Sequence, residues 1–435
     1  MKKSPDIEKI RSQAGQGQFS QIAEELSRVA AEDRAKLLAA LPESQAAPVF
    51  RFLDPAYQEE VLHGLSQPQV LRLVEALNPD DRARLLEQMP AALARNLLTG
   101  LSPAERRMTT ELLGYPPQSA GRYMTPEFLV LTPDLPVAEA WEKIRSQGKR
   151  AETIYVLPVI SGDARYIGII HLRELVMADP EQKVHEFLDD TLPPILATED
   201  REIAARSIQR TAALAAPVVD AQGRLLGLVT VDDAMDILDR EGEEDLARAG
   251  GGAEPLNRPY FSVSVLRLAR TRFVWLLTLA IAAVLTVNVL KVFEATLEAM
   301  VTLALFIPLL IDTGGNSGAQ SATVLVRAMS VGEVEAGDFL QILLREAAVG
   351  LLLGSMLALM SFVPVWLFAG HKIALVVALT LVCICGWASA VGAAVPLAAW
   401  RLGIDPAVAS APFITTLIDA TGLIFYFLIA RAVLF

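Results

Sequence analysis

Two acidic residues of this 435-residue chain, Asp312 and Asp419, lie inside long apolar runs in its C-terminal part. A charge at the centre of a bilayer costs about 2.5–3.5 kcal/mol even on insertion scales, so such residues usually face a partner or a water-filled cavity. No lysine or arginine lies within these runs to neutralise either carboxylate. A cation that crosses the membrane would neutralise them. The alternative is that each carboxylate lies near a helix end, where lipid headgroups solvate it.

The segment around Asp312 reads FIPLLIDTGGNSGAQSATVLVRAM. Asn316 and Gln320 are four residues apart, which places two amide oxygens on one helix face. Pro308 precedes glycines at 314, 315 and 318. Because proline removes a backbone donor and glycine lowers helix propensity by about 1 kcal/mol, the segment predicts a broken or kinked helix that lines protein or water. Alternatively, the small residues permit tight packing between helices.

The segment around Asp419 places small and polar residues on one helix face. Thr415 and Asp419 are i and i+4, and Ala411 and Gly422 extend the same stripe. The opposite face is bulky and apolar. A carboxylate on such a stripe suits a water-filled pore that holds a hydrated cation. Carboxylate, hydroxyl and carbonyl oxygens are hard ligands for Mg²⁺ or Ca²⁺, and neither segment contains a cysteine or histidine.

Apolar runs long enough to cross a hydrocarbon core of about 30 Å must position these carboxylates. We expect a transmembrane domain over residues 266–435 with five helices, at residues 273–290, 299–326, 347–370, 373–400 and 406–430. With the N-terminus in the cytosol, most basic residues of the intervening loops lie inside, in agreement with the positive-inside rule. An odd number of spans then places the C-terminus outside.

The composition of the chain is divided between its two halves. Hydrophobic residues make up 53% and the mean hydropathy is +0.39, yet the formal net charge is −12. Residues 267–435 carry nine basic and nine acidic side chains, so the negative excess belongs to the front half. An acidic front half argues against nucleic acid and anionic lipid as partners and in favour of cations. Without an apolar signal segment or a disulfide framework, we expect it in the cytosol.

The first part of the front half, residues 1–118, consists of short amphipathic segments. Pro42, Pro55, Pro79 and Pro90 mark successive helix starts, where proline is tolerated. This pattern predicts an all-α helical stack that serves packing or interaction, because it contains no catalytic constellation.

Residues 120–240 contain an internal repeat. YVLPVISGDARYIGIIHL, from Tyr155, aligns with LAAPVVDAQGRLLGLVTV, from Leu214, and each copy predicts a helix, two strands and a helix. The pattern resembles a tandem pair of CBS domains, an α+β fold, at about 119–182 and 183–238. CBS pairs commonly bind adenine nucleotides, which makes ATP a candidate ligand, with Arg173 and Glu174 as its contacts. His171 departs from the Ser or Thr of that family, and structural roles for Arg173 and Glu174 are the alternative.

A linker over residues 239–265 begins as an acidic helix, which glycines 250–252 end. Its acidic residues are Asp239, Glu241, Glu243, Glu244 and Asp245. Acidic helices are usually solvated faces. This helix, however, joins the repeats to the first span, and its carboxylates repel any carboxylates that they face. Divalent cations that screen this repulsion would lock the domains together.

The order of helical domain, CBS pair, acidic linker helix and apolar spans is similar to that of the MgtE family of Mg²⁺ channels. The motifs that carry the resemblance are AETIY at 151–155, ADP at 178–180, ExxED at 241–245, FE at 293–294, PLLIDTGGNSGAQSAT at 308–323 and DPAVASAPFITTLID at 405–419. The resemblance implies a homodimer with a pore between the subunits, built from the second and fifth spans.

The resemblance also implies roles for individual residues. Asp419 matches the pore carboxylate of the family, Thr415 falls at a small pore-lining position, and Ala411 departs from members with a polar side chain there. Asp312 and Asn316 complete the expected pore set, and Asp405 matches a carboxylate at the cytosolic mouth. The other regulatory metal ligands expected are Asp239, Glu241, Glu244 and Asp245 of the linker ("plug") helix, with Asp80 or Asp81 of the N-terminal domain.

The function implied is Mg²⁺ uptake across the cytoplasmic membrane with feedback. High cytosolic Mg²⁺ bridges the acidic surfaces and closes the pore, and low Mg²⁺ lets repulsion separate them. The alternative is a transporter or exchanger for another divalent cation such as Co²⁺ or Mn²⁺. An intramembrane metalloprotease would need an H-E-x-x-H helix, and the four histidines are unpaired, so we expect no enzyme.

Overall fold

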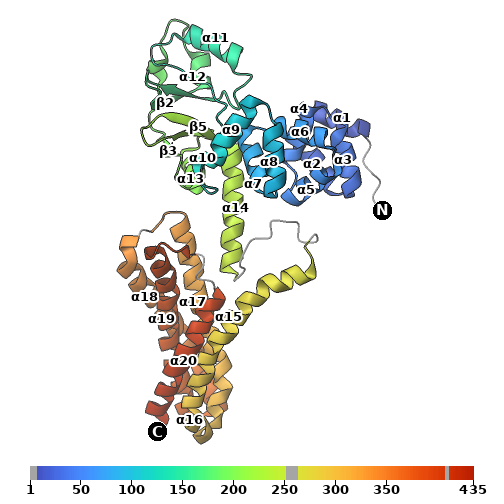
Figure 1. The fold of residues 1–435 in the computed structure, drawn as a ribbon. Helices are drawn as coiled ribbons and strands as arrows, with labels where there is room; N and C mark the ends of the chain where they lie inside the picture. Colours follow the sequence, from blue (N-terminus) through green and yellow to red (C-terminus); the bar gives the residue numbers. More distant parts are fainter. Residues whose placement is uncertain (1–6, 251–262, 335, 407–410) are drawn as a thin grey trace. The chain divides into compact units, whose positions relative to one another are not determined.

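The computed structural model describes residues 7–250, 263–334, 336–406 and 411–435. The chain forms two compact units, unit 1 with the residues up to Glu241 and unit 2 with most of those that follow. Unit 1 combines short helices with small sheets, and unit 2 is a bundle of long helices (Figure 1). Helix α14 (Val231–Ala249) begins in unit 1 and ends in unit 2.

The N-terminal part of unit 1 is an all-helical stack, as predicted. Its helices are α1 (Ile7–Gly15), α2 (Phe19–Ser27), α3 (Ala31–Ala39), α4 (Glu43–Arg51), α5 (Pro55–Gly64), α6 (Gln67–Glu75), α7 (Pro79–Glu87), α8 (Ala91–Gly100) and α9 (Pro103–Leu113). Pro55 and Pro79 are the first residues of α5 and α7, and Pro42 and Pro90 immediately precede α4 and α8. The amphipathic faces pack into one core around the fully buried Ile22, Leu38 and Phe50.

Two buried arginines tie successive helices of this stack together. Arg82 donates hydrogen bonds to the carbonyls of Val74 (2.9 Å) and Leu77 (2.6 Å) at the end of α6. Arg34 does the same for Leu26 and Val29 at the end of α2, both at 2.9 Å. The last carbonyls of a helix have no partner within it, so these arginines satisfy groups that burial would otherwise leave unpaired.

The remainder of unit 1 is a pair of α+β repeats, which confirms the predicted duplication. Strands β1 (Val156–Ile160) and β2 (Tyr166–His171) form one antiparallel hairpin, and β4 (Ala215–Val219) and β5 (Leu225–Thr230) form the other, with β3 (Ile195–Leu196) beside β4. Pro158 pairs with Ile169 and Pro217 with Leu228, so both hairpins have the same register. The helices are α10 (Ala120–Tyr123), α11 (Val137–Gln147), α12 (Leu172–Met177), α13 (Arg201–Thr211) and α14.

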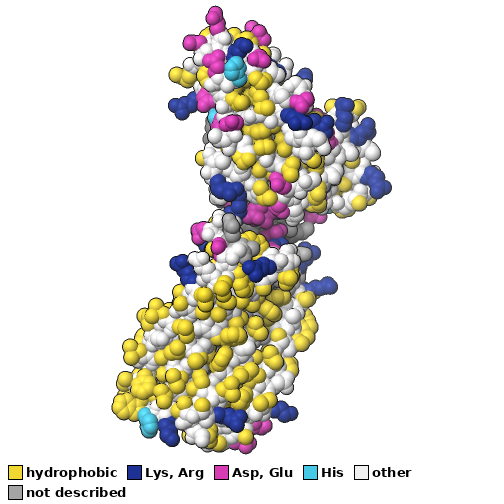
Figure 2. Space-filling model, turned by 90° about the vertical axis from the view of Figure 1, so that its left-hand side faces the viewer, with side chains coloured by type: hydrophobic (Ala, Val, Ile, Leu, Met, Phe, Trp, Pro, Cys, Tyr) yellow, Lys and Arg dark blue, Asp and Glu magenta, His cyan; other side chains and the backbone are white. Residues whose placement is uncertain are grey.

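Besides the end of α14 and short 3₁₀ segments, the described residues of unit 2 form five long α-helices and one short one. These are α15 (Val265–Val292), α16 (Glu294–Ala299), α17 (Ile307–Ser330), α18 (Phe339–Ala369), α19 (His371–Arg401) and α20 (Ala411–Leu434). Four of them, α15, α18, α19 and α20, are long and apolar enough to cross a membrane. Hydrophobic side chains cover the visible face of this unit (Figure 2), as lipid contact requires. Helix α17, which carries Asp312, is not among the four, so the count of five spans stays a prediction.

The second span has no break at its glycines, where the sequence predicted one. Helix α17 runs without interruption from Ile307 to Ser330, with Pro308 in its first turn and a 3₁₀ segment (Val301–Phe306) before it. The glycines serve packing instead: a side chain at Gly318 would collide with Ile418, and one at Gly392 with the Gly318 carbonyl. The close approach of α17 to α19 and α20 outweighs the weak helix propensity of glycine, as the alternative of tight packing between helices predicted.

Candidate ion pathway and acidic clusters

Helices α17 and α20, which carry the two intramembrane carboxylates, pack directly against each other. A Cβ on Gly315 would lie 3.2 Å from Cγ2 of Thr415, so α20 fits closely against this glycine. The rest of α20 is anchored by the buried Tyr426, whose hydroxyl donates a 2.8 Å hydrogen bond to the Leu303 carbonyl. The contact fixes the relative position of the Asp312 and Asp419 helices.

The predicted pore residues lie on accessible parts of these helices. Asp312 and Asn316 are exposed along one face of α17, and Asp419, Thr415 and Ala411 are half-buried on α20. Within the described part of the chain, neither carboxylate has an ion pair or hydrogen-bond partner. The Thr415 hydroxyl donates to the carbonyl of Pro412 at 3.0 Å, which leaves its oxygen lone pairs as acceptors.

A polar seam on another side of α17 was missed by the sequence analysis. The hydroxyl of Ser321 lies 2.7 Å from Oε2 of Glu346 on α18 and 2.9 Å from the carbonyl of Ser389 on α19. Ser317 and Ser389 share a 3.0 Å hydrogen bond. At about 100° per residue, Ser317 lies roughly a quarter turn around the helix from Asn316. Glu346 immediately precedes the third expected span at 347–370. An acidic residue at the edge of an apolar span was the feature of the sequence that could have indicated this polar seam.

The acidic residues at the end of α14 are paired with arginines. Glu241 accepts hydrogen bonds from Arg201 at 2.6 and 2.8 Å in unit 1. In unit 2, Arg248 pairs with Glu244 at 3.3 Å and with Asp405. Asp239 is exposed and Asp245 half-buried. The structure therefore brings Asp405 and Glu244 together, through an arginine that the sequence analysis did not consider.

Asp80 and Asp81 meet a third carboxylate, Asp233, which no sequence motif indicated as a metal ligand. One oxygen of each residue lies within 4.8 Å of the others, in an arrangement that could hold a metal ion. Arg84 and Arg51 contact the same cluster. Asp233 lies in the first turn of α14, soon after the GLVTV strand of the second repeat. An acidic residue at this position, at the end of a strand, was the feature of the sequence that could have pointed to it.

The candidate nucleotide contacts, Arg173 and Glu174, lie in the first turn of α12. Arg173 is exposed, and Oε2 of Glu174 is buried without a hydrogen-bond partner among the described residues. His171, which departs from the CBS pattern, has Nε2 3.7 Å from the Asp189 carboxylate.

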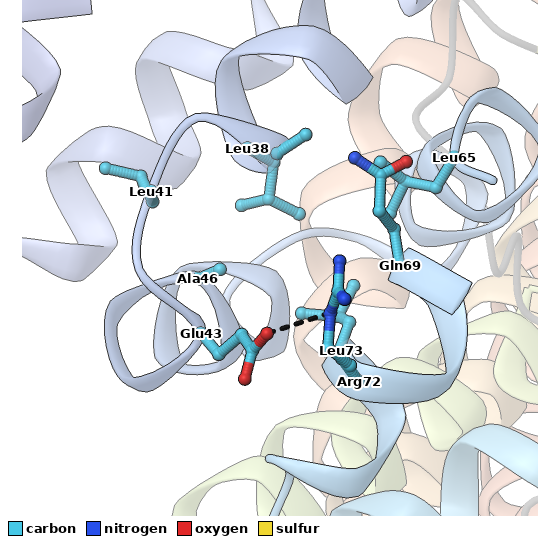
Figure 3. A pocket seen from close by; sticks show the side chains of 9 residues that line it. Leu38, Leu41, Glu43, Ala46, Leu65, Gln69, Arg72 and Leu73 are labelled. Carbon is cyan, nitrogen blue, oxygen red and sulfur yellow. Dashed lines mark ion pairs between the residues drawn. The ribbon is translucent and has the colours of Figure 1, made fainter. Parts of the chain in front are cut away.

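A pocket of about 90 Å³ that opens to solvent lies in the helical stack (Figure 3). Leu38, Leu41 and Leu73 are among its lining residues, and a 2.9 Å ion pair between Arg72 and Glu43 lies at its side. This side-chain set offers hydrophobic contact and one neutralised charge pair, and it contains no group for catalysis.

Comparison with known proteins decides the family. The profile described as MgtE, "Divalent cation transporter", matches residues 307–429, the "MgtE intracellular N domain" matches 18–118, and the CBS domain matches 120–181 and 184–240. The "Magnesium transporter MgtE" of Thermus thermophilus is 36% identical over 408 residues, 93% of this chain and 90% of that protein. The chain belongs to the MgtE family of magnesium transporters.

Further relatives extend this result. The "Magnesium transporter MgtE" of Bacillus subtilis is 30% identical over 402 residues, 92% of this chain and 88% of the relative. A solved structure of the cytosolic domain of the Mg²⁺ channel MgtE in complex with ATP is 30% identical, with a TM-score of 0.46, and covers 53% of this chain and all of that one. As an MgtE family member, the chain is a membrane protein of magnesium transport and not an enzyme, as the sequence motifs predicted.

Proposed function

We propose that the chain is a Mg²⁺ channel that mediates Mg²⁺ uptake across the cytoplasmic membrane as a homodimer. The observation that carries this proposal is Asp419, a half-buried carboxylate with no partner among the described residues, on an apolar helix. Two copies of this residue, one from each subunit, would supply the negative charge that attracts Mg²⁺. The exposed Asp312 and Asn316 face of α17 would complete the pore wall.

The pore would recognise Mg²⁺ with its water shell. Mg²⁺ dehydrates reluctantly and usually keeps several waters when it binds. Carboxylate oxygens of Asp419 and the lone pairs of Thr415 accept hydrogen bonds from such waters, and the small Ala411 leaves room for the hydrated ion. The charge on Asp419 supplies most of the attraction, because the other two groups are neutral.

Regulation would act where α14 meets Asp405. In our proposal, cytosolic Mg²⁺ binds among Glu241, Glu244, Asp245 and Asp405, with Asp239 nearby, and holds the linker helix against the pore mouth. When cytosolic Mg²⁺ falls, repulsion between these carboxylates opens the channel. This proposal places the N-terminal domains in the cytosol, and five spans would then place the C-terminus outside.

Nucleotide binding is a second part of the proposal. The buried Oε2 of Glu174 has no protein partner among the described residues, and a carboxylate at that position would accept hydrogen bonds from the ribose hydroxyls of ATP. Arg173 would contact the phosphates. Isothermal titration of the purified chain with ATP, compared with Glu174→Gln, tests this assignment, and equal affinity in both proteins would contradict it.

Growth of a Mg²⁺-starved, transport-deficient strain tests the transport proposal in cells. The wild-type chain should restore growth, whereas Asp419→Ala should not, and Glu333→Gln, an exposed carboxylate on the loop after α17, serves as the matched control. Flux in liposomes with competing Co²⁺ and Mn²⁺, with and without a pH or Na⁺ gradient, distinguishes a Mg²⁺ channel from an exchanger for another cation. Flux that requires such a gradient would contradict the channel mechanism.

A further inference from the structure

The carboxylate cluster of Asp80, Asp81 and Asp233 joins the helical stack to the second CBS repeat. Asp80 and Asp81 lie in the first turn of α7, and Asp233 lies in the first turn of α14. Asp80 and Asp233 are each only 1% exposed. Buried carboxylates so close together repel one another strongly unless a positive charge lies among them.

The positive charge at the centre of this cluster is the guanidinium of Arg84. Its Nη2 lies 3.0 Å from Oδ2 of Asp80 and 2.9 Å from Oδ1 of Asp233, and it also contacts Oδ1 of Asp81. One nitrogen thus touches all three carboxylates that could bind a metal ion. The guanidinium also lies over the ring of Tyr123 in the CBS part, 5.2 Å from the ring centre, which fixes its position.

A second arginine reaches the same joint from α4. Nη2 of Arg51 lies 2.8 Å from Oδ2 of Asp232 and 3.2 Å from Oδ1 of Asp233. Its Nε lies 3.2 Å from Oδ2 of Asp81. Two arginines of the helical stack therefore hold the carboxylates at the start of α14.

We propose that Arg51 and Arg84 are built-in counter-ions that hold the helical stack on the CBS pair without Mg²⁺. A Mg²⁺ ion would need the space that Nη2 of Arg84 fills, so this cluster is closed to the metal while the arginine is present. The expected role of Asp80 and Asp81 as regulatory metal ligands is thereby replaced by an arginine-bridged joint. The regulatory meaning rests on the proposed function: Mg²⁺ feedback would act at Asp405 and the end of α14 instead.

Hydrogen exchange of the full-length chain in detergent, with EDTA or with millimolar Mg²⁺, tests this proposal without any transport measurement. In the wild type, protection of α7 and the first turns of α14 should differ by less than about twofold between the two conditions. In Arg84→Gln, the uncompensated carboxylates should lower protection at least about tenfold in EDTA, and Mg²⁺ should restore it. Arg72→Gln removes an exposed arginine of the same stack and should behave as the wild type.

The proposal would be overturned by a wild-type joint that loses protection in EDTA, or by an Arg84→Gln joint that stays fully protected in EDTA. If Arg84→Gln is unprotected in both conditions, the double variant Arg84→Gln/Asp233→Asn decides. It removes one positive and one negative charge, so it should regain protection in EDTA, and continued loss would contradict the counter-ion role. None of these results depends on whether the chain conducts Mg²⁺. Failure of the channel proposal can therefore be distinguished from failure of the counter-ion proposal.

Discussion

Arg248 near the end of α14 forms an ion pair with Asp405, which precedes α20, and pairs with Glu244 one turn earlier on its own helix. An arginine thus lies between two of the carboxylates for which the sequence predicted a divalent cation. Glu241 is similarly paired with Arg201. In our proposal, Mg²⁺ must compete with this arginine for the carboxylates at the pore mouth, and the arginine therefore sets the Mg²⁺ concentration at which the channel closes.

Replacement of Arg248 by Gln should make the channel close at lower Mg²⁺. The substitution removes a positive charge from between Glu244 and Asp405, so these carboxylates attract Mg²⁺ more strongly. We expect the half-closing Mg²⁺ concentration to fall about three- to tenfold, equivalent to about 1 kcal/mol of electrostatic interaction. Flux from liposomes at graded Mg²⁺ on the regulatory side measures this. Arg240→Gln, an exposed arginine of the same helix, is the control, and an unchanged half-closing concentration in Arg248→Gln would refute the competition.

The polar seam between α17, α18 and α19 should stabilise unit 2. Ser321→Ala removes the single hydroxyl proton that the two acceptors, Glu346 and the Ser389 carbonyl, share, and we expect a loss of about 0.5–1.5 kcal/mol, the contribution of one hydrogen bond. Glu346→Gln keeps an acceptor and should lose less than Glu346→Leu. The unfolding temperatures of the variants in detergent measure how much stability each one loses. Ser355→Ala, which removes a hydroxyl bonded only within α18, is the control, and a Ser321→Ala protein that unfolds at the wild-type temperature would count against the seam.

Gly318→Ala should weaken the packing of α17. The new methyl group would collide with Ile418 and lie 3.0 Å from the carbonyl of Ala388, and overpacking of this kind costs about 1–3 kcal/mol. Shortening the opposing side chain with Ile418→Val should recover part of the loss. Gly337→Ala, at a position with open space around it, should change the unfolding temperature little. If Gly318→Ala is as stable as Gly337→Ala, glycine is not required for this contact.

Ionisation of Glu152 should lower the stability of unit 1 as the pH rises from about 4.5 to about 7. Burial and the nearby carboxylates of α14 and α7 raise the pKa of Glu152 from 4.5 to about 7. Below about pH 4.5 this carboxyl is protonated in the folded and unfolded chain alike, and no penalty arises. Between about pH 4.5 and 7 the folded state binds the proton more tightly, so the cost of ionisation grows and is complete above about pH 7.

Unfolding temperatures at about pH 5.5 and 8, on either side of that raised pKa, measure this effect. Glu152→Gln has no proton to lose at this position, so its unfolding temperature should decrease less between the two pH values than that of the wild type. Glu139→Gln, an exposed carboxylate on α11, should leave the wild-type decrease unchanged. An equal decrease in all three proteins would show that Glu152 does not contribute.

The features that could be predicted from the sequence are those that depend on neighbouring residues or on a repeating pattern. Asp312 and Asp419 were identified because a charge in an apolar run is costly, and the two repeats because their strands align residue by residue. The arginine counter-ions were not identified, since Arg84 and Asp233 are 149 residues apart and Arg248 and Asp405 are 157 apart. Such contacts depend on how whole domains pack, and no sequence pattern links the partners.

The break predicted at the glycines of α17 was wrong for a related reason. Glycine propensity is a weak local preference, and contacts with Ile418 and Ala388 that only the folded bundle provides outweigh it. The same glycines were consistent with tight helix packing, and the sequence alone did not decide between the two.

Mg²⁺ flux into liposomes that contain the purified chain tests the central claim most directly. With an inward Mg²⁺ gradient and nominally Mg²⁺-free buffer on the regulatory side, the wild type and Glu333→Gln should carry Mg²⁺ at similar rates. Asp419→Asn has nearly the same shape without the charge, and its flux should fall at least about tenfold, the effect of about 1.4 kcal/mol or more. Undiminished Mg²⁺ flux through Asp419→Asn would contradict the assignment of Asp419 as the pore carboxylate.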